Sequence, residues 1–414
     1  MAALSQCGQL VPLACLGVVS FVSSLRGLTL VDRAARPLKW VRETWKAARA
    51  VRRERGTSTL GVLSEQARLF RQYDLDQYAY YWYRLFEKHI PLEEKSHYLP
   101  DSVAANARLW SLLTPDSYRC LYDNKLVFNR FFGSLGFPLA EIYGVYDPHV
   151  GYTAGGEPLR TSEDLRRCLL RHGDNGFVFK PAEGIQGHHI LVFTGGTPGE
   201  TGEELVTLSG DRYDAARLAD FARETSALSE HNPGANPVPF LLEQRLIPHQ
   251  RLAEFLGPTL CSVRVQTIVA RDGHPQIIAA VFKLQPGSVG VDQLIHGAVG
   301  CWVDLESGRL GRGRTRTDRA DASVIPGTDR PFAGFELPHW SGVKELVLRA
   351  AAAFPWARAI GWDVAISASG PVLIEGNERW SPSLIQMPAP RGLMRGEFQA
   401  LCESLRRHRT SGDS

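Results

Sequence analysis

Two carboxylates and an amide lie at the ends of two short apolar runs near the C-terminus. Asp363 opens the run 362–367, and Glu375 closes the run 371–376, with Asn377 two residues further on. A Ser-Ala-Ser-Gly turn joins the runs, so this segment predicts a β-hairpin. Alternation along a strand would bring the three side chains to one face of the sheet. Hard oxygen ligands of this kind suit Mg²⁺, although the same residues also fit a solvated hairpin end without a ligand.

A lysine and two glycines follow another apolar strand within residues 176–193. Lys180 ends that strand, and Gly184 and Gly187 lie in the loop before a second strand at 190–193. Glycine lets backbone N–H groups approach phosphate oxygens, and the lysine adds a positive charge. The segment lacks the GxxxxGK[ST] pattern of a Walker A loop. It therefore predicts a phosphate-binding loop of another kind.

The order of these segments along the chain resembles the ATP-grasp superfamily, and most closely its sugar-transfer-associated branch. A Lys-Gly loop comes first, then LLEQRL at residues 241–246, and then the late Asp…Glu-x-Asn hairpin. The resemblance extends from about Val62 to about Leu401. It implies an α+β fold, the ATP-grasp fold, in which two α+β subdomains clasp ATP behind a helical N-terminal region.

The resemblance also implies roles for individual residues. The residues implied to bind the nucleotide are Lys125, Lys180, Glu183, Gly184, Gly187, Glu243, Gln244 and Leu246. The residues implied to be catalytic, beside the transferred phosphate, are Arg264 and Lys283. The implied ligands of one or two Mg²⁺ ions are Asp363, Glu375 and Asn377.

Three of these positively charged residues, Lys125, Arg264 and Lys283, could also be ordinary structural residues without a ligand. Lys125 could be an exposed residue in the first turn of a helix predicted at 123–138. Lysine is unfavourable beside a helix N-terminus, however, which favours a phosphate partner slightly. Arg264 and Lys283 lie on two predicted strands joined by an Asp-Gly turn, and either could simply form a pair across the sheet.

The chemistry that the resemblance implies is ATP-dependent ligation through an acylphosphate. ATP phosphorylates a carboxylate, and an amine or similar nucleophile then displaces phosphate, while a lid at 184–187 excludes water. A role in cell-surface polysaccharide or glycan biosynthesis rests on the resemblance alone. The sequence departs from the common Ser-Pro-Gly turn of such ligases after Asn377, which leaves the acceptor undefined. The alternatives are a kinase-like ATP-grasp phosphotransferase and a non-catalytic ATP-binding scaffold.

Composition and charge restrict the class of protein further. The 414 residues are 44% hydrophobic and 22% charged, as in a soluble protein with two or three subdomains. Residues 26–55 carry ten Lys/Arg and three Asp/Glu, so this arm has a charge of +7 and the remainder −4. This distribution argues against a nucleic-acid groove in the body. Seven scattered cysteines without a CxxC motif predict reduced thiols in a cytoplasmic protein.

We expect the chain to be organised into an N-terminal arm, a helical lead-in, an ATP-grasp domain and a tail. Their expected ranges are 1–60, 61–120, 121–405 (subdomains 121–240 and 241–405) and 406–414. Residues 1–25 are uncharged and suit either a membrane anchor or a plain tail, and they lack the basic start of a signal peptide. Residues 1–55 could thus contact a membrane surface, although 40–55 also suits an ordinary solvated helix.

Helical spacing predicts two buried faces, and composition predicts one mobile loop. The face expected within 76–86 consists of Tyr78, Tyr81, Trp82 and Leu85. The face expected within 123–138 consists of Leu126, Val127, Phe131 and Leu135. Residues 311–330 are rich in Arg, Thr and Asp and predict a polar, mobile loop.

Overall fold

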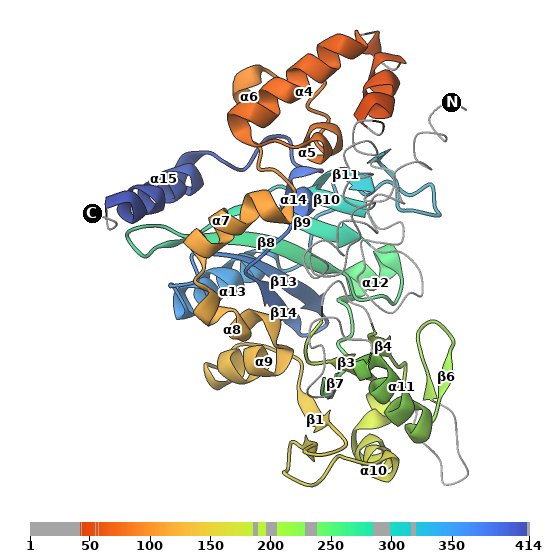
Figure 1. Ribbon diagram of the computed structural model, residues 1–414. Coiled ribbons are helices and arrows are strands. Elements are labelled where there is room, and N and C mark those ends of the chain that lie inside the picture. The colour runs from red at the N-terminus through yellow and green to blue at the C-terminus, as the bar shows by residue number, and fades with distance from the viewer. Residues whose placement is uncertain are drawn as a thin grey trace, which may run out of the picture.

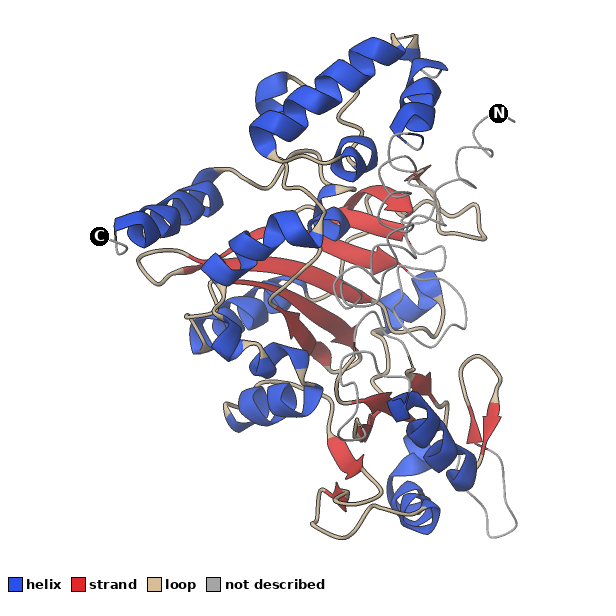
Figure 2. Ribbon diagram, in the orientation of Figure 1, coloured by secondary structure: helices blue, strands red, loops and turns tan. Residues whose placement is uncertain are grey.

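The computed structural model of the chain describes residues 42–184, 189–195, 205–227, 238–284, 299–315 and 320–411, except 43, 54 and 57. Figures 1 and 2 show a large β-sheet at the centre, a smaller sheet below it and a group of helices above it. This arrangement of helices and sheets confirms the predicted α+β class.

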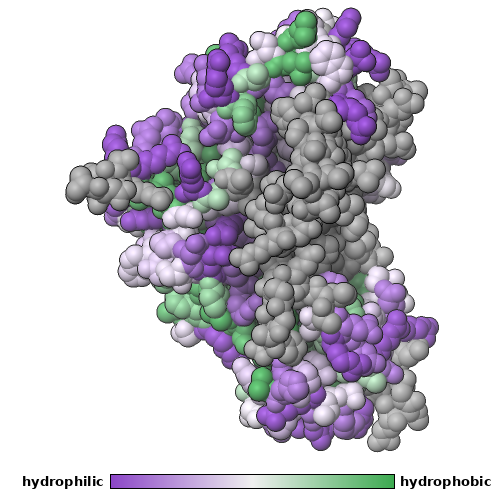
Figure 3. All heavy atoms as spheres, in the orientation of Figure 1, coloured by the Kyte–Doolittle hydropathy of each residue, from purple (hydrophilic) through white to green (hydrophobic). Residues whose placement is uncertain are grey.

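The N-terminal region is helical, as predicted. Its helices are residues 44–53, α4 (Thr59–Tyr73), α5 (Gln77–Trp82), α6 (Leu92–Ser96) and α7 (Val103–Leu113). Figure 3 shows apolar side chains at the top of the view, over α4, and hydrophilic residues over much of the remaining described surface. None of the helices in the described ranges has the length and apolarity that a membrane span requires.

The predicted buried face of α5 is largely wrong. The buried side chains in this segment are Gln77, Ala79, Tyr80, Tyr83 and Leu85, whereas Tyr78, Tyr81 and Trp82 are only half-buried. The helix ends at Trp82, and Arg84 takes a left-handed conformation with φ 55°. Helical spacing therefore does not continue to Leu85, and the residues after the helix turn inward instead.

The smaller sheet has five strands in the order β2-β1-β7-β3-β4. Its strands are β1 (Ile142–Tyr146), β2 (Tyr152–Thr153), β3 (Phe177–Pro181), β4 (Leu191–Val192) and β7 (Phe240–Gln244). The accompanying elements are α10 (Ser162–His172), α11 (Ala215–Ala227), and the strand pair β5 (Leu205–Val206) and β6 (Arg212–Tyr213). The sequence signal for α10 is confirmed, because Thr161 and Asp164 form a reciprocal capping box.

The large sheet has seven strands in the order β12-β11-β10-β9-β8-β13-β14. Its strands are β8 (Ser262–Val269), β9 (Pro275–Leu284), β10 (Val299–Val303), β11 (Leu310–Thr315), β12 (Asp321–Ala322), β13 (Ala359–Ser367) and β14 (Gly370–Asn377). The predicted hairpins β8–β9 and β13–β14 are both confirmed. The loop predicted at 311–330 is partly wrong, since β11 and β12 occupy residues 311–315 and 321–322 of it.

Helices cover both faces of the large sheet. One face packs on α13 (Trp340–Ala353) and α9 (Lys125–Ser134), with α8 (Cys120–Asp123) beside them, and α12 (Gln250–Leu256) adds to this core. The other face packs on α7, α14 (Pro382–Gln386) and α15 (Gly396–Ser411). The sequence thus supplies apolar residues to both sides of these strands, apart from the positions described below.

The predicted buried face of α9 needs correction. Val127 and Leu135 are 38% and 50% exposed, whereas Phe128 and Phe132 are fully buried. The two phenylalanine rings lie 4.6 Å apart, and both contact Trp362 of β13. An aromatic i, i+4 pair that meets a tryptophan buries more apolar surface than the predicted aliphatic face could.

Two short linkers join the smaller sheet to the hairpin β13–β14. The linker before β1 runs along β14, where Leu139 pairs with Leu373 and the Leu373 N–H donates to Pro138 O at 3.0 Å. The linker 245–249 after β7 runs along the far end of the hairpin, where the His249 N–H donates to Ile366 O at 3.0 Å. Both connections hold the smaller sheet against the strands that carry the predicted metal ligands.

Candidate active site

Four charged residues, the charged row, share one face of the large sheet: Arg264, Lys283, Asp363 and Glu375. Asp363 of β13 lies directly opposite Arg264 on one side and Glu375 on the other. Arg264 in turn lies opposite Val281, which shares its face with Lys283 two residues later. The strand register therefore brings together residues such as Arg264 and Asp363, which lie 99 positions apart in the sequence.

Asp363 binds both cations of the charged row. Arg264 donates to the two carboxylate oxygens at 2.6 and 2.8 Å, and Lys283 Nζ lies 3.2 Å from Oδ2. The Asp363 side chain is 4% exposed. Burial would raise the pKa of this carboxyl, but the Arg264 and Lys283 charges outweigh it and hold the pKa well below its usual value. Arg264 and Lys283 are therefore fixed in place.

Glu375 and Asn377 fit the role of oxygen donors to a hard cation. The Asn377 amide nitrogen donates to Gly361 O at 3.2 Å and to Glu375 Oε1 at 3.4 Å, which turns its amide oxygen the other way. Asp363 differs, because both of its oxygens already bind cations. Its assignment as a metal ligand stays a prediction. Among the described residues, no three His, Cys, Asp or Glu side chains converge as a metal-binding group.

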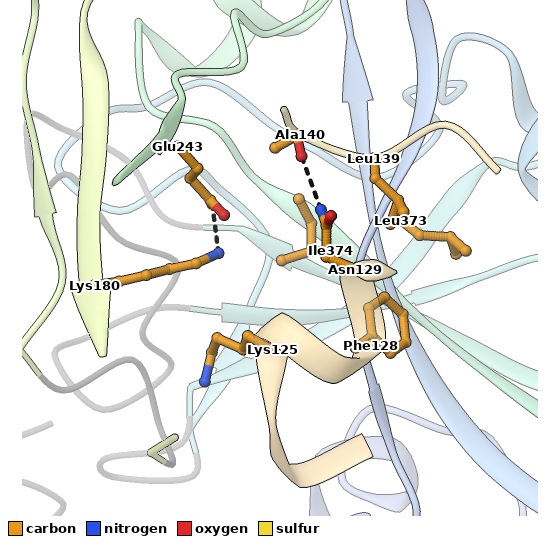
Figure 4. Close-up of a pocket in the computed structure, with 9 residues that line it drawn as sticks. All are labelled: Lys125, Phe128, Asn129, Leu139, Ala140, Lys180, Glu243, Leu373 and Ile374. Carbon is orange, nitrogen blue, oxygen red and sulfur yellow. Dashed lines mark hydrogen bonds and ion pairs between the residues drawn. The ribbon is translucent and has the colours of Figure 1, made fainter. Parts of the chain in front are cut away.

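A cavity lies between the two sheets, beside the charged row. The residues that line it are Lys125, Phe128, Asn129, Leu139, Ala140, Lys180, Glu243, Leu373 and Ile374. Figure 4 shows the side chains of Lys180 and Glu243 facing each other from β3 and β7, where they form a buried ion pair. Ile374 directly precedes Glu375, and burial lowers the pKa of the lining residue Lys125 while the charge of Glu375 opposes this shift, so the cavity lies next to this end of the charged row.

Lys125 joins this group from the first turn of α9. Its Nζ donates to Gly184 O at 3.2 Å, and its backbone N–H donates to Ala182 O at 2.8 Å. Burial lowers the pKa of Lys125; Glu375 opposes this shift, and the nearby Lys180 charge adds to it. An anion that bound between the two lysines would relieve their mutual repulsion.

The other residues that were predicted to bind the nucleotide do not line this cavity, and one of them lies outside the described residues. Glu183 accepts a hydrogen bond from Asn124 Nδ2 at 2.9 Å, beside Lys125. Gln244 and Leu246 lie at and beyond the end of β7 and do not line the cavity. Gly187 lies outside the described residues, whereas Gly184 has φ +147°, a conformation that favours glycine.

Sequence reasoning did not identify the apolar part of the cavity. The lining residues that it missed are Phe128, Asn129, Leu139, Ala140, Leu373 and Ile374. Asn129 donates to Ala140 O at 2.9 Å, which fixes the chain just before β1. The position of Ile374 beside a predicted metal ligand was the available signal for one of them. The others depend on how the linker crosses β14, which no local pattern encodes.

Gly361 leaves room for Arg264, and this gives a first prediction. A Cβ at 361 would lie 3.0 Å from Arg264 Cδ and 3.2 Å from Trp380 Cβ. We expect Gly361→Ala to displace Arg264 from Asp363 and to lower the free energy of unfolding, measured with urea, by about 1–3 kcal/mol. The same change at Gly311, where the nearest atoms are 3.7 Å away, is the control. Equal effects at both positions would contradict this interpretation.

The chain resembles several solved structures at low sequence identity. An N5-carboxyaminoimidazole ribonucleotide synthetase in complex with ADP is 13% identical, with a TM-score of 0.35, covering 68% of this chain and 52% of that one. A D-alanyl-alanine synthetase A from Vibrio cholerae is 12% identical, with a TM-score of 0.34, covering 69% and 60%. A biotin carboxylase from Campylobacter jejuni is 13% identical, with a TM-score of 0.34, covering 68% and 48%. The chain thus spans about half to three fifths of these proteins.

The chain was also compared with curated proteins and with models of protein families. No curated protein matches the chain. The model of the sugar-transfer associated ATP-grasp family matches residues 104–402, which include both sheets, the cavity and the charged row. The predicted family and fold are thereby confirmed. The chain belongs to the sugar-transfer associated ATP-grasp family.

Proposed function

We propose that the protein is an ATP-dependent ligase that joins a carboxylate to an amine or a similar nucleophile through an acylphosphate. The observation that supports this most is the convergence of the charged row with the two lysines of the cavity. Phosphoryl transfer needs negative charge neutralised and the reacting groups held in line. The described residues offer fixed cations for the first requirement and a rigid sheet for the second.

Each group would have a separate task. Lys125 and Lys180 would hold the α- and β-phosphates of ATP, and the apolar lining would accept part of the nucleotide. Arg264 and Lys283 would neutralise charge on the transferred phosphoryl group, and Asp363 would keep both in position. The two sheets would act as the two halves that clasp ATP, with the linker 245–249 between them.

Mg²⁺ would be held by Glu375 and Asn377, whose donor atoms suit a hard cation. When bound, one or two Mg²⁺ ions would neutralise phosphate charge as Lewis acids. Asp363 could join these ligands through the remaining lone pair of Oδ1, since Oδ2 already faces both Arg264 and Lys283. We therefore infer that its first task is to position the two cations.

Nucleotide binding tests this proposal first. Lys180→Ala removes a buried positive charge and leaves Glu243 unpaired near the phosphates. We expect the Kd for ATP, measured by calorimetry in the presence of Mg²⁺, to rise about 10- to 100-fold, as for loss of a charged hydrogen bond. Lys88→Ala, at an exposed position in the helical lead-in, is the matched control and should leave the Kd unchanged.

The result separates three functions. Absence of ATP binding by well-folded protein would overturn the nucleotide site and favour a scaffold. ATP binding followed by release of ADP and free phosphate, in a screen of carboxylates and amines, would support the ligase. Phosphate that remains on the acceptor would instead assign a kinase-like reaction.

We further propose that the substrates belong to glycan assembly and that the protein works in the cytoplasm, in contact with a membrane surface through residues 1–55. The family description supports the first point. For the second, helix 44–53 exposes Lys46, Arg52 and Arg53, and Trp45 is 40% exposed with the Arg49 guanidinium 5.7 Å above its ring. Sedimentation with anionic vesicles tests this contact.

A further inference from the structure

Three arginines surround Asp321 where the helical region meets the large sheet, and one of them, Arg84, also forms an ion pair with Glu87. Asp321 Oδ1 accepts from Arg312 Nη2 and from Arg314 Nε, both at 3.0 Å. Its other oxygen lies 3.6 Å from Arg84 Nη1. Arg84 follows α5, whereas the other two arginines lie on β11, and Figure 1 shows α5 close to β11 at the upper part of the large sheet. We call Arg84, Arg312 and Arg314 the arginine cluster.

Arg314 is the buried member of the arginine cluster. Its side chain is only 1% exposed, and its Nη1 donates to Trp82 O at 2.9 Å. Burial lowers the pKa of Arg314 to about 10, and the Arg312 charge adds to this shift. A buried charge needs full compensation. Asp321 provides only part of it, because it is 54% exposed and one of its oxygens is shared by two guanidinium groups.

The arginine cluster lies on the same sheet face as the charged row. Arg314 is directly opposite Gly300 of β10, and Gly300 is directly opposite Lys283 of β9. Directly paired residues point to the same side of a sheet. Two strand spacings separate the Cα atoms of Arg314 and Lys283, which is about 10 Å. The two groups therefore lie on one face of the sheet, with Pro388 packed near Gly300 between them.

We propose that the arginine cluster binds a phosphoryl or pyrophosphoryl group, in competition with Asp321. The planar guanidinium fork matches phosphate oxygens, and a doubly charged oxyanion would compensate the buried Arg314 better than one shared carboxylate does. If the bound phosphoryl group is part of the acceptor substrate of the ligase, that assignment rests on the proposed function. The binding of a phosphoryl group by the arginine cluster does not rest on it, because it needs only the described residues of this junction.

Calorimetry with inorganic pyrophosphate tests the site through two variants of opposite effect. Arg312→Gln removes the half-exposed cation and should weaken pyrophosphate binding at least about tenfold. Asp321→Asn removes the competing carboxylate and should tighten binding severalfold. Arg309→Gln is the control, since Arg309 precedes the same strand but lies 3.6 Å from Glu336 instead. It should leave the pyrophosphate affinity unchanged.

Lys180→Ala separates this site from the nucleotide site, which could also accept pyrophosphate. If pyrophosphate binding persists in Lys180→Ala and falls in Arg312→Gln, while Arg312→Gln still binds ATP normally, the proposal is supported. If pyrophosphate binding is instead lost in Lys180→Ala and unchanged in Arg312→Gln, pyrophosphate binds in the nucleotide site. That result overturns the proposal without affecting the proposed function. Weaker binding in Asp321→Asn, at an unchanged melting temperature, also overturns it.

A vesicle experiment identifies the source of the phosphate. If sedimentation with phosphatidylglycerol vesicles falls in Arg312→Gln relative to Arg309→Gln, the bound phosphate belongs to a lipid headgroup. If sedimentation is equal in the two variants while pyrophosphate affinity differs, the phosphate belongs to a soluble substrate.

Discussion

Replacement of Asp363 by asparagine should lower the rate of ADP formation at least about 100-fold and destabilise the fold by about 3–5 kcal/mol. Asparagine keeps the size of the side chain but removes the charge that holds Arg264 and Lys283. Two cations would then remain buried without their carboxylate, and neither would stay in the position that we propose for phosphoryl transfer. Turnover and urea unfolding at pH 7 measure the two effects.

The sign of the pH dependence follows from the depressed pKa of Asp363. In the unfolded chain this carboxyl titrates near its ordinary value of about 3.9. The folded pKa lies lower, so the stabilisation is fully present above about pH 4 and is lost as the pH falls below that value. Asp363→Asn lacks this contribution, so the difference in stability between the two proteins should shrink at acid pH.

Asp272→Asn is a suitable control for Asp363→Asn. Asp272 is exposed in the β8–β9 turn, where its side chain accepts from the His274 N–H at 3.0 Å. Asparagine can keep that bond, so stability and turnover should be unchanged. Wild-type turnover in Asp363→Asn, or a stability difference that does not vary with pH, would contradict the positioning role.

Replacement of Glu375 by glutamine should lower turnover about 1,000-fold, equivalent to about 4 kcal/mol, while leaving the fold intact. Glu375 is half-buried, and its hydrogen bond from Asn377 is long, at 3.4 Å. Stability should therefore depend little on its charge, whereas a bound cation should depend on it strongly. Titration of ADP formation with Mg²⁺ should show a much higher metal requirement.

Two further variants make the Glu375 result decisive. Asn377→Ala removes the neighbouring amide and should also raise the Mg²⁺ requirement, with little change in melting temperature. Glu345→Gln, at an exposed position of α13, should behave like the wild type. Unchanged turnover in Glu375→Gln would rule out the metal assignment.

Local sequence signals predicted the elements whose residues interact within the same segment. The turn between the runs of β13 and β14, the Asp-Gly turn of β8–β9 and the Thr161–Asp164 capping box depend on neighbours a few positions apart. Alternation in the hairpin likewise predicted that Asp363 and Glu375 face the same side. The pattern of a strand followed by a glycine loop predicted Lys180 of the smaller sheet, and the family resemblance added Glu243.

Features that depend on distant packing were not predictable in the same way. Helical spacing within α9 could not indicate that Trp362 selects Phe128 and Phe132 for burial. Arg314 lies in a stretch whose composition is typical of a polar loop, yet pairing with β10 and β12 buries it completely. Such outcomes depend on which strands become neighbours, which one segment does not contain.

The pairing of Leu139 with β14 has a consequence for aggregation. An exposed edge strand offers unpaired backbone groups to other chains and so promotes assembly into fibrils. The outer strand β14 of the large sheet is partly shielded, because Leu373 already donates to Pro138 O. At the opposite edge, the described strand β12 is only two residues long. Unfolding of the linker at 138–140 would therefore expose a long apolar edge, and concentrated protein should then self-associate through β14.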